Sequence, residues 1–224
     1  MLCENDARAA VLAAARGMLE RGLTSGTSGN VSARVDGGTL VITPSGLPYQ
    51  DMGLADLVLI TMTGEPVPAG AASASAGGLA PSSEHQLHTA CYQAFPEIGA
   101  VLHSHPPYAS MFAAARQPVP AVIDEAVIFL GGEIPLAPYA ISGSAGVGAN
   151  AVAVLAHRAS ALLASHGLVT VAATPAQALH CAVVSEHCAQ VAWGTRALGG
   201  HVPLPAATLD VFGAAYRRGR GRLS

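Results

Sequence analysis

The sequence predicts a single-domain α/β protein in which helices flank a mainly antiparallel central sheet. Helical and extended patterns alternate along the 224 residues, and no internal repeat divides them. A chain of this length can bury one sizeable core and is short for two. The dipeptide Asp36-Gly37, set between two short apolar runs, indicates an antiparallel hairpin. We therefore expect residues 1–224 to form one domain, in which the segment from about residue 205 could be a flexible tail.

The expected elements follow from local patterns taken in order. Residues 5–22 are rich in alanine and predict a first helix that ends at Gly22. Residues 64–80, rich in Gly, Ala, Ser and Pro, predict a loop. Thr174-Pro175 predicts the start of a long final helix that runs to about Leu198. The other predicted helices are 82–95, 107–116 and 146–158, and the predicted strands are 31–35, 39–43, 56–61, 98–104 and two short strands within 161–172.

Composition limits the classes of function. Hydrophobic residues make up 51% of the chain and charged residues only 11%, against about 25% charged in typical soluble domains. So little charge favours an oligomer, although a genome-wide alanine bias explains it equally well. The formal net charge of −3 gives no broad basic field, so we expect no nucleic-acid partner. The basic side chains that do cluster lie in the C-terminal tail, where such groups are usually just solvated: Arg217, Arg218, Arg220 and Arg222.

The sequence shows no targeting signal. The N-terminus carries acids where a secretory signal carries positive charge, and no run of about 20 apolar residues could span a bilayer. The four cysteines show neither zinc-ribbon spacing nor a disulfide framework. Two of them, Cys181 and Cys188, are expected to pack inside a helix. These observations predict a cytoplasmic protein with reduced thiols and no membrane association.

The most informative pattern is His103-Ser104-His105, at the end of a predicted strand. Residues i and i+2 of a strand point to the same face, so both imidazoles leave the sheet together. A lone histidine is more often a core residue than a ligand, but this pairing reverses the preference. Glu84 and His166 can add a carboxylate and a third imidazole, a set that suits zinc first and Mn²⁺ or Co²⁺ as alternatives. His85 and His88 are rival ligands, and His88, at i+4 from Glu84, could instead support it.

The absence of lysine narrows the chemistry further. All 11 basic residues are arginine. Schiff-base catalysis needs a lysine amine, and a P-loop needs its lysine. Any carbonyl chemistry in this chain must therefore proceed without an enzyme-bound imine.

Three tight, hydroxyl-rich turns are candidate phosphate sites. They are residues 26–30, residues 43–46 and the pair Ser82-Ser83 at a predicted helix N-terminus. Backbone N–H groups together with hydroxyls can bind an anion without any basic side chain. Each turn alone is weak evidence, but one of them lies beside the candidate ligand Glu84. A lysine-free protein that binds a phosphate monoester would need such a site.

These motifs, in this order, resemble the class II aldolase and adducin family, specifically the group of L-fuculose-1-phosphate aldolase and L-ribulose-5-phosphate 4-epimerase. The resemblance covers about residues 5–200. The matching segments are 22–32, 42–49, 81–84, 103–105, 137–140 and 166–168. The resemblance implies a zinc-bearing α/β fold that assembles as a fourfold homotetramer, with active sites at subunit interfaces.

The resemblance also implies roles for individual residues. The zinc ligands would be Glu84, His103, His105 and His166. The phosphate pocket would comprise Gly29, Asn30, Ser45, Gly46, Ser82 and Ser83, with Thr27 as a further hydroxyl. Glu84 would double as the catalytic acid/base. Epimerases of the family carry aspartate at that place, so Glu84 favours the aldolase branch.

The implied reaction is the cleavage of a ketose phosphate between C3 and C4. Zinc would stabilise the resulting enediolate, and Glu84 would protonate it to give dihydroxyacetone phosphate and an aldehyde. This role requires the site to shift the pKa of the carboxyl group.

Three positions depart from the family pattern or align poorly with it. Asp124 stands where the fuculose-phosphate enzyme has a tyrosine, and Glu125 lies beside it. Ser142 replaces a phenylalanine of the aldehyde pocket. Asp124 is therefore a candidate catalytic residue, although a solvated turn or an interface salt bridge explains it equally well. Tyr216 is a candidate for the C-terminal tyrosine that closes the family's site.

The predicted function is thus a zinc-dependent aldolase acting on a short ketose 1-phosphate. The nearest alternative is an epimerase, dehydratase or decarboxylase acting on a sugar phosphate with the same scaffold. A non-enzymatic, adducin-like module is a further alternative, which the intact ligand set disfavours.

Overall fold

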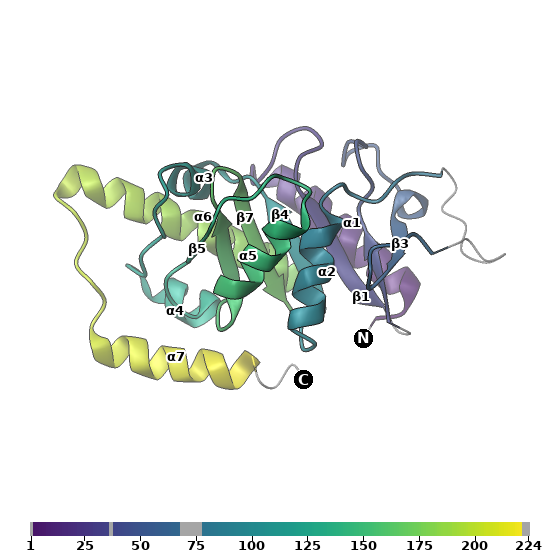
Figure 1. The fold of residues 1–224 in the computed structure, drawn as a ribbon. Coiled ribbons are helices and arrows are strands. Elements are labelled where there is room, and N and C mark those ends of the chain that lie inside the picture. The colour runs from purple at the N-terminus through teal and green to yellow at the C-terminus, as the bar shows by residue number, and fades with distance from the viewer. Residues whose placement is uncertain (1, 36–37, 68–77, 221–224) are drawn as a thin grey trace.

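A single sheet of seven strands forms the centre of the molecule, in the order β3-β2-β1-β4-β7-β6-β5 (Figure 1). The computed structural model describes residues 2–35, 38–67 and 78–220. Neighbouring strands pair antiparallel throughout, except that β5 pairs parallel with β6. The strands are β1 (Asn30–Val35), β2 (Thr39–Ile42), β3 (Val58–Thr61), β4 (Ala100–Ser104), β5 (Leu136–Ala137), β6 (Ser160–Leu163) and β7 (Gly167–Ala172). The predicted α/β class with a mainly antiparallel sheet is confirmed.

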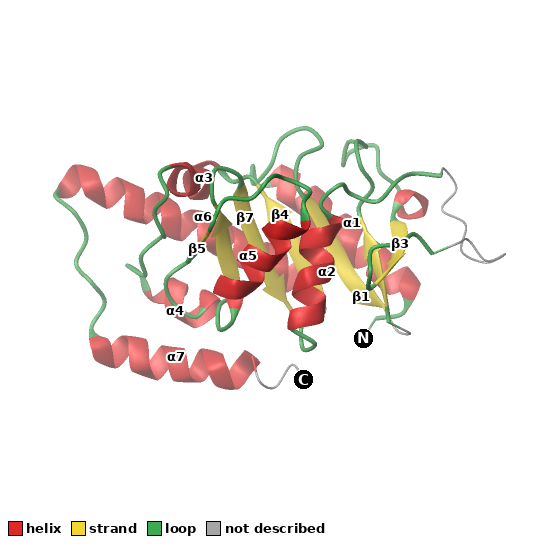
Figure 2. Cartoon of the chain, in the orientation of Figure 1, coloured by secondary structure: helices red, strands yellow, loops and turns green. Residues whose placement is uncertain are grey.

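Helices cover both faces of the sheet (Figure 2). α2 and α5 pack against each other on one face, and α1 and α6 cover the other, with α3 and α4 packed on α6. The helices are α1 (Glu4–Glu20), α2 (His85–Ala94), α3 (Pro107–Ala114), α4 (Asp124–Leu130), α5 (Ala145–Leu155), α6 (Pro175–Thr195) and α7 (Ala206–Arg220), with 3₁₀ turns at Leu54–Asp56 and Arg196–Leu198. The sheet is therefore the middle of three layers.

The alternation of side chains along the central strands separates two hydrophobic cores. On β4, Ala100 and Leu102 face the core beneath α1 and α6, whereas Val101 faces the core beneath α2 and α5. His103 follows the parity of Val101 and so leaves β4 on the α2 side. On β1, Asn30 lies opposite His103 and therefore shares that face. The register of two neighbouring strands thus brings polar side chains together under α2.

Most predicted elements are present, with shifts at their ends. Thr174 accepts a hydrogen bond from the Gln177 amide and caps α6, whose first residue is Pro175. The strand expected from residue 56 begins at Val58, because residues 54–56 form a 3₁₀ turn. The predicted turn Asp36-Gly37 and part of the predicted loop 64–80 lie outside the described residues.

Two helices were not predicted. α4 follows the segment after Pro118, where the apolar run is too short to show a helical period. The stretch from about residue 205, considered as a flexible tail, forms α7. It packs on α4 rather than on the sheet.

Three of the four cysteines lie inside helices. Cys181 and Cys188 are buried within α6, as expected, and Cys91 is buried in α2. Burial raises the pKa of the Cys188 thiol to about 12, with the nearby Glu125 charge adding to the shift.

Within the described ranges, every helix is too short or too polar to cross a membrane.

The close packing of α2 on α5 depends on Gly148. A Cβ atom at this position would lie 2.7 Å from Ala90 Cβ and 3.0 Å from the Gln86 carbonyl oxygen. We expect Gly148→Ala to lower the free energy of unfolding by about 1–2 kcal/mol, because overpacking outweighs the gain of about 1 kcal/mol in helix propensity. Gly194→Ala in α6 is the matched control, since nothing lies within 4 Å of its Cβ position. Urea unfolding of both variants measures the difference, and a stabilised Gly148→Ala would contradict the packing described.

Candidate active site

The four side chains predicted as metal ligands meet where β4 ends and β7 begins. His103 lies in β4, His105 follows that strand, and His166 directly precedes β7. The ligand nitrogens of these histidines all lie within 4.8 Å of one another. Glu84 is the N-cap residue of α2, which begins at His85 rather than at residue 82 as predicted, and its side chain makes no capping hydrogen bond. The carboxylate is instead directed at the histidines.

The contacts of His103 fit those of a metal ligand. Its Nδ1 lies 2.9 Å from the Leu168 carbonyl oxygen, which can only accept, so Nδ1 carries the proton. In the neutral ring Nε2 then presents a lone pair. This atom lies 3.1 Å from Glu84 Oε2 and 2.9 Å from His105 Nε2. In that tautomer no proton lies between His103 Nε2 and Glu84 Oε2, and three imidazoles with one carboxylate fit a zinc-like ion.

Both oxygens of the Glu84 carboxylate have two neighbours. His166 Nε2 lies 3.1 Å from Oε1, and Ser142 Oγ donates a hydrogen bond of 2.9 Å to the same atom. Asn30 Nδ2 donates a hydrogen bond of 2.9 Å to Oε2, the oxygen that also faces His103. The carboxylate is therefore fixed between two imidazoles and two neutral donors.

The surroundings determine the protonation of these groups. Burial raises the pKa of the Glu84 carboxyl, but protonated forms of His103 and His166, together with the Asn30 amide, lower it more, so the pKa lies well below its usual range. Burial, helped by the neighbouring His103 and His166, lowers the pKa of His105 to about 4. An ionised carboxylate and a neutral imidazole are the forms that bind a divalent metal.

The three hydroxyl-rich turns lie side by side. The backbone N–H of Ser45 donates to the Ala80 carbonyl at 3.0 Å, and that of Ser82 donates to the Thr43 carbonyl at 3.1 Å. Thr43 also exchanges hydrogen bonds with Val31 at the start of β1. These contacts bring together the predicted phosphate residues Gly29, Asn30, Ser45, Gly46, Ser82 and Ser83. Thr27 is exposed on the same turn as Gly29.

Gly29 joins this group of turns to the histidine cluster. Its φ is +79°, and a Cβ atom there would lie 2.7 Å from the His103 carbonyl oxygen. The Tyr49 hydroxyl donates to the Gly29 carbonyl at 2.5 Å and to the Ser28 carbonyl at 3.1 Å. The turn is thereby held against β4, and only glycine fits this close approach.

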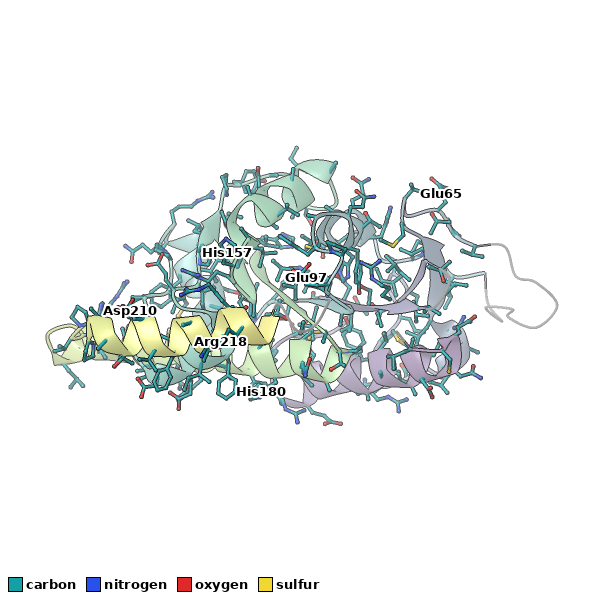
Figure 3. The ribbon with its side chains drawn as sticks, turned by 90° about the horizontal axis from the view of Figure 1, so that it is seen from below. Glu65, Glu97, His157, His180, Asp210 and Arg218 are labelled. Carbon is teal, nitrogen blue, oxygen red and sulfur yellow. The ribbon has the colours of Figure 1, made fainter. Side chains whose placement is uncertain are left out.

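Two predicted catalytic residues do not reach the cluster within the chain. Asp124 is exposed at the start of α4, which packs on α6 and α7. Tyr216 lies against Gly131 and helps to line a cavity of about 590 Å³ that also contacts Val171 and Ala172, at the opposite end of β7 from His166. Figure 3 shows α7 crossing this lower side of the molecule, near His157 and His180. Their proposed roles would need a second copy of the chain.

Sequence reasoning missed several polar contacts of the site. Ser142 was assigned to an aldehyde pocket, but its hydroxyl donates to Glu84. His88 was predicted to be a rival ligand or a residue that supports Glu84. It contacts Asn30 and Ser32 in the core beneath α2 and α5. A usable signal was present, because Glu84, His88 and Tyr92 repeat at the spacing of one helix turn.

The chain matches a known protein family over most of its length. Residues 9–193 match the family model described as the class II aldolase and adducin N-terminal domain. The chain is 33% identical over 203 residues to 5-methylthioribulose-1-phosphate/5-deoxyribulose-1-phosphate aldolase of Rhodospirillum rubrum, covering 91% of this chain and 87% of that protein. It is 34% identical over 187 residues to L-fuculose phosphate aldolase of Escherichia coli O6:H1, covering 84% and 82%.

A solved structure agrees with this assignment. The structure of an L-fuculose 1-phosphate aldolase superposes with a TM-score of 0.86 at 27% sequence identity, covering 95% of this chain and 96% of that one. The family model spans most of the chain, and the aldolases match over nearly the same range. The chain therefore belongs to the class II aldolase and adducin N-terminal domain family.

Proposed function

We propose that the chain is a zinc-dependent aldolase that cleaves a short ketose 1-phosphate into dihydroxyacetone phosphate and an aldehyde. The observation that supports this most is the position of Glu84. It lies within the histidine cluster, and its backbone N–H donates to Ser82 Oγ in the phosphate turns at 3.2 Å. A phosphate bound at these turns would place the adjacent carbons of a ketose phosphate at the cluster.

The proposed division of labour follows from the side chains present. A divalent ion held by Glu84, His103, His105 and His166 would supply a Lewis acid that stabilises the negative charge left when the C3–C4 bond breaks. The chain has no lysine that could stabilise this charge through an imine. The ion and the imine are alternative electron sinks, and this chain retains residues for only the first.

Glu84 would transfer the proton at the carbon released by cleavage. Its carboxyl group must then accept and return a proton at Oε1 or Oε2. The contacts with His103, His166 and Asn30 lower the pKa of this group, so proton uptake requires those contacts to loosen. Ser142 Oγ, which donates to Oε1, would hold the carboxylate in register during that step.

The phosphate would be bound without basic side chains. Ser45, Ser82 and Ser83 offer hydroxyls, and α2 begins directly after Glu84, so its dipole favours an anion there. We further propose a homotetramer with sites between subunits. The apolar side chains of Tyr139 and Ile141, close in sequence to Ser142, are 58% and 72% exposed, as an interface beside the site would require.

The decisive experiment combines metal analysis with a substrate screen. The purified protein is assayed for dihydroxyacetone phosphate release from 5-methylthioribulose 1-phosphate, 5-deoxyribulose 1-phosphate and L-fuculose 1-phosphate. Two fragments identify an aldolase, whereas loss of water or carbon dioxide, or an isomeric product, identifies the alternative reactions on this scaffold. A protein that purifies without metal and acts on none of these substrates would support the adducin-like alternative.

The metal assignment predicts the behaviour of the histidine variants. His103→Ala and His105→Ala should lose bound zinc and all detectable turnover, because each removes one imidazole of the ligand set. His187→Ala is the control, since this histidine is exposed on α6. Elemental analysis after gentle purification measures the zinc, and a stoichiometric metal content in either site variant would refute the assignment.

Glu84→Gln separates the two roles of the carboxylate. The amide retains an oxygen that can bind metal but cannot carry a proton. We expect partial metal retention and a loss of kcat of about 100-fold or more, the usual contribution of general acid–base catalysis. Near-normal kcat at full metal occupancy would contradict the acid/base role.

Ser142→Ala tests the contact that the sequence did not predict. A hydrogen bond to a charged group contributes about 1.5–3 kcal/mol, and because Ser142 is exposed we expect the lower end of this range, a fall in kcat of about tenfold at constant zinc content. Ser144→Ala is the matched control in the same loop, because its hydroxyl donates to the Ile141 carbonyl and not to Glu84. Equal losses in both variants would indicate that the loop, rather than the contact with Glu84, determines the rate.

A further inference from the structure

A buried row of polar groups runs from Glu84 into the core between α2 and β1. Asn30 Oδ1 lies 2.6 Å from His88 Nε2, and His88 Nδ1 lies 2.6 Å from Ser32 Oγ. Ser32 Oγ in turn lies 3.0 Å from the Tyr92 hydroxyl. None of Asn30, Ser32, His88 and Tyr92 is more than 3% exposed. A polar row at this depth persists only when each group has a partner.

The row arises because two secondary-structure periods match. Glu84, His88 and Tyr92 recur every four residues, so they lie along one side of α2, about 6 Å apart. Asn30 and Ser32 are alternate residues of β1 and share one face, about 6.8 Å apart. Side chains from the helix and the strand therefore interleave in the order Glu84, Asn30, His88, Ser32 and Tyr92.

The orientation of the Asn30 amide fixes the direction of every other hydrogen bond in the row. Its Nδ2 donates to Glu84 Oε2 at 2.9 Å, so its Oδ1 faces His88. Oδ1 can only accept, so His88 Nε2 carries a proton. His88 is fully buried between Asn30 and Ser32, and burial, together with His103, lowers its pKa to about 3, so the ring is neutral. Its Nδ1 is then an acceptor.

The directions of the remaining two hydrogen bonds follow from the same count of protons. Ser32 has one hydroxyl proton, and His88 Nδ1 requires it. Tyr92 must therefore donate to Ser32 Oγ. Burial raises the pKa of the Tyr92 hydroxyl, which keeps it protonated. Each group thus donates one proton towards Glu84, and no other assignment satisfies all five groups.

We propose that His88 is a positioning residue that locks the orientation of the Asn30 side-chain amide, so that Asn30 presents only N–H donors to the active site. One hydrogen of Nδ2 binds Glu84 Oε2, and the second is available to a substrate phosphate oxygen. Without His88 the amide would be held by Glu84 alone, and it could rotate by 180° whenever that contact breaks. The phosphate contact rests on the proposed function, whereas the fixed orientation of Asn30 and the protonation of His88 do not.

Two variants of His88 distinguish positioning from space filling. Gln has its amide nitrogen at the place of Nε2 and can still donate to Asn30. Asn has its amide at the place of Nδ1, so it can still contact Ser32 but is too short to reach Asn30. We expect His88→Asn to weaken inorganic phosphate binding to the zinc-loaded protein and to lower kcat/KM by about 10- to 100-fold, the usual cost of losing a group that orients a ligand. His88→Gln should retain most of both, with unchanged zinc content.

The tautomer of His88 gives a readout that is independent of catalysis. In ¹⁵N-histidine-labelled protein the His88 ring should show a protonated Nε2 and an unprotonated Nδ1 between pH 5 and 8. A protonated Nδ1, or equal effects of the two His88 variants on phosphate affinity, would overturn the proposal. If the wild-type protein neither binds phosphate nor releases dihydroxyacetone phosphate, the proposed function fails, and the tautomer alone decides the orientation of Asn30.

Discussion

The buried carboxylate of Glu84 is the constraint on which the rest of the site depends. A carboxylate withdrawn from water is costly unless charges or hydrogen bonds compensate it. Here four elements supply that compensation: Asn30 at the start of β1, His103 in β4, His166 before β7, and Ser142 in the loop before α5. Each must be placed to within an ångström, so the order of strands in the sheet is part of the chemistry. Because β4 lies between β1 and β7, all three strands deliver their groups at one end of the sheet.

The same constraint explains why polar residues occupy the core beneath α2. The β1 side chains that face the opposite layer, Val31 and Ala33, are fully buried and apolar. On the α2 side, Asn30 and Ser32 take the corresponding positions and are equally buried. Polar groups at these positions replace apolar contacts that would stabilise the core. The hydrogen-bond network offsets this loss of stability only because each donor has an acceptor. Stability in this layer is therefore coupled to the charge state of the active site.

Much of this architecture could be predicted from sequence because local patterns were strong. The His103-Ser104-His105 pair identified the histidine cluster, and the alternation of elements identified the fold class. α4 and α7 could not be predicted in the same way, because α4 is a single short helix and α7 packs on α4 rather than on the sheet. The role of Ser142 was hidden for a different reason. A serine in a loop shows no periodic pattern in the sequence. Ser142 and Glu84 are 58 residues apart in the chain, and only folding brings them into contact.

In the proposed mechanism Glu84 serves both as a metal ligand and as an acid/base, and these two roles have conflicting requirements. As a ligand it must be ionised, and the imidazoles that surround it lower its pKa in that direction. As an acid it must hold a proton, which requires a second arrangement of the side chain with a similar free energy. The neutral donors Asn30 and Ser142 permit such an arrangement, since each can hold one oxygen of the carboxylate without adding charge. A lysine or arginine in their place would fix the ionised form and remove the proton transfer. The neutral donors Asn30 and Ser142, which hold Glu84 beside the histidines, are therefore what the proposed double role requires.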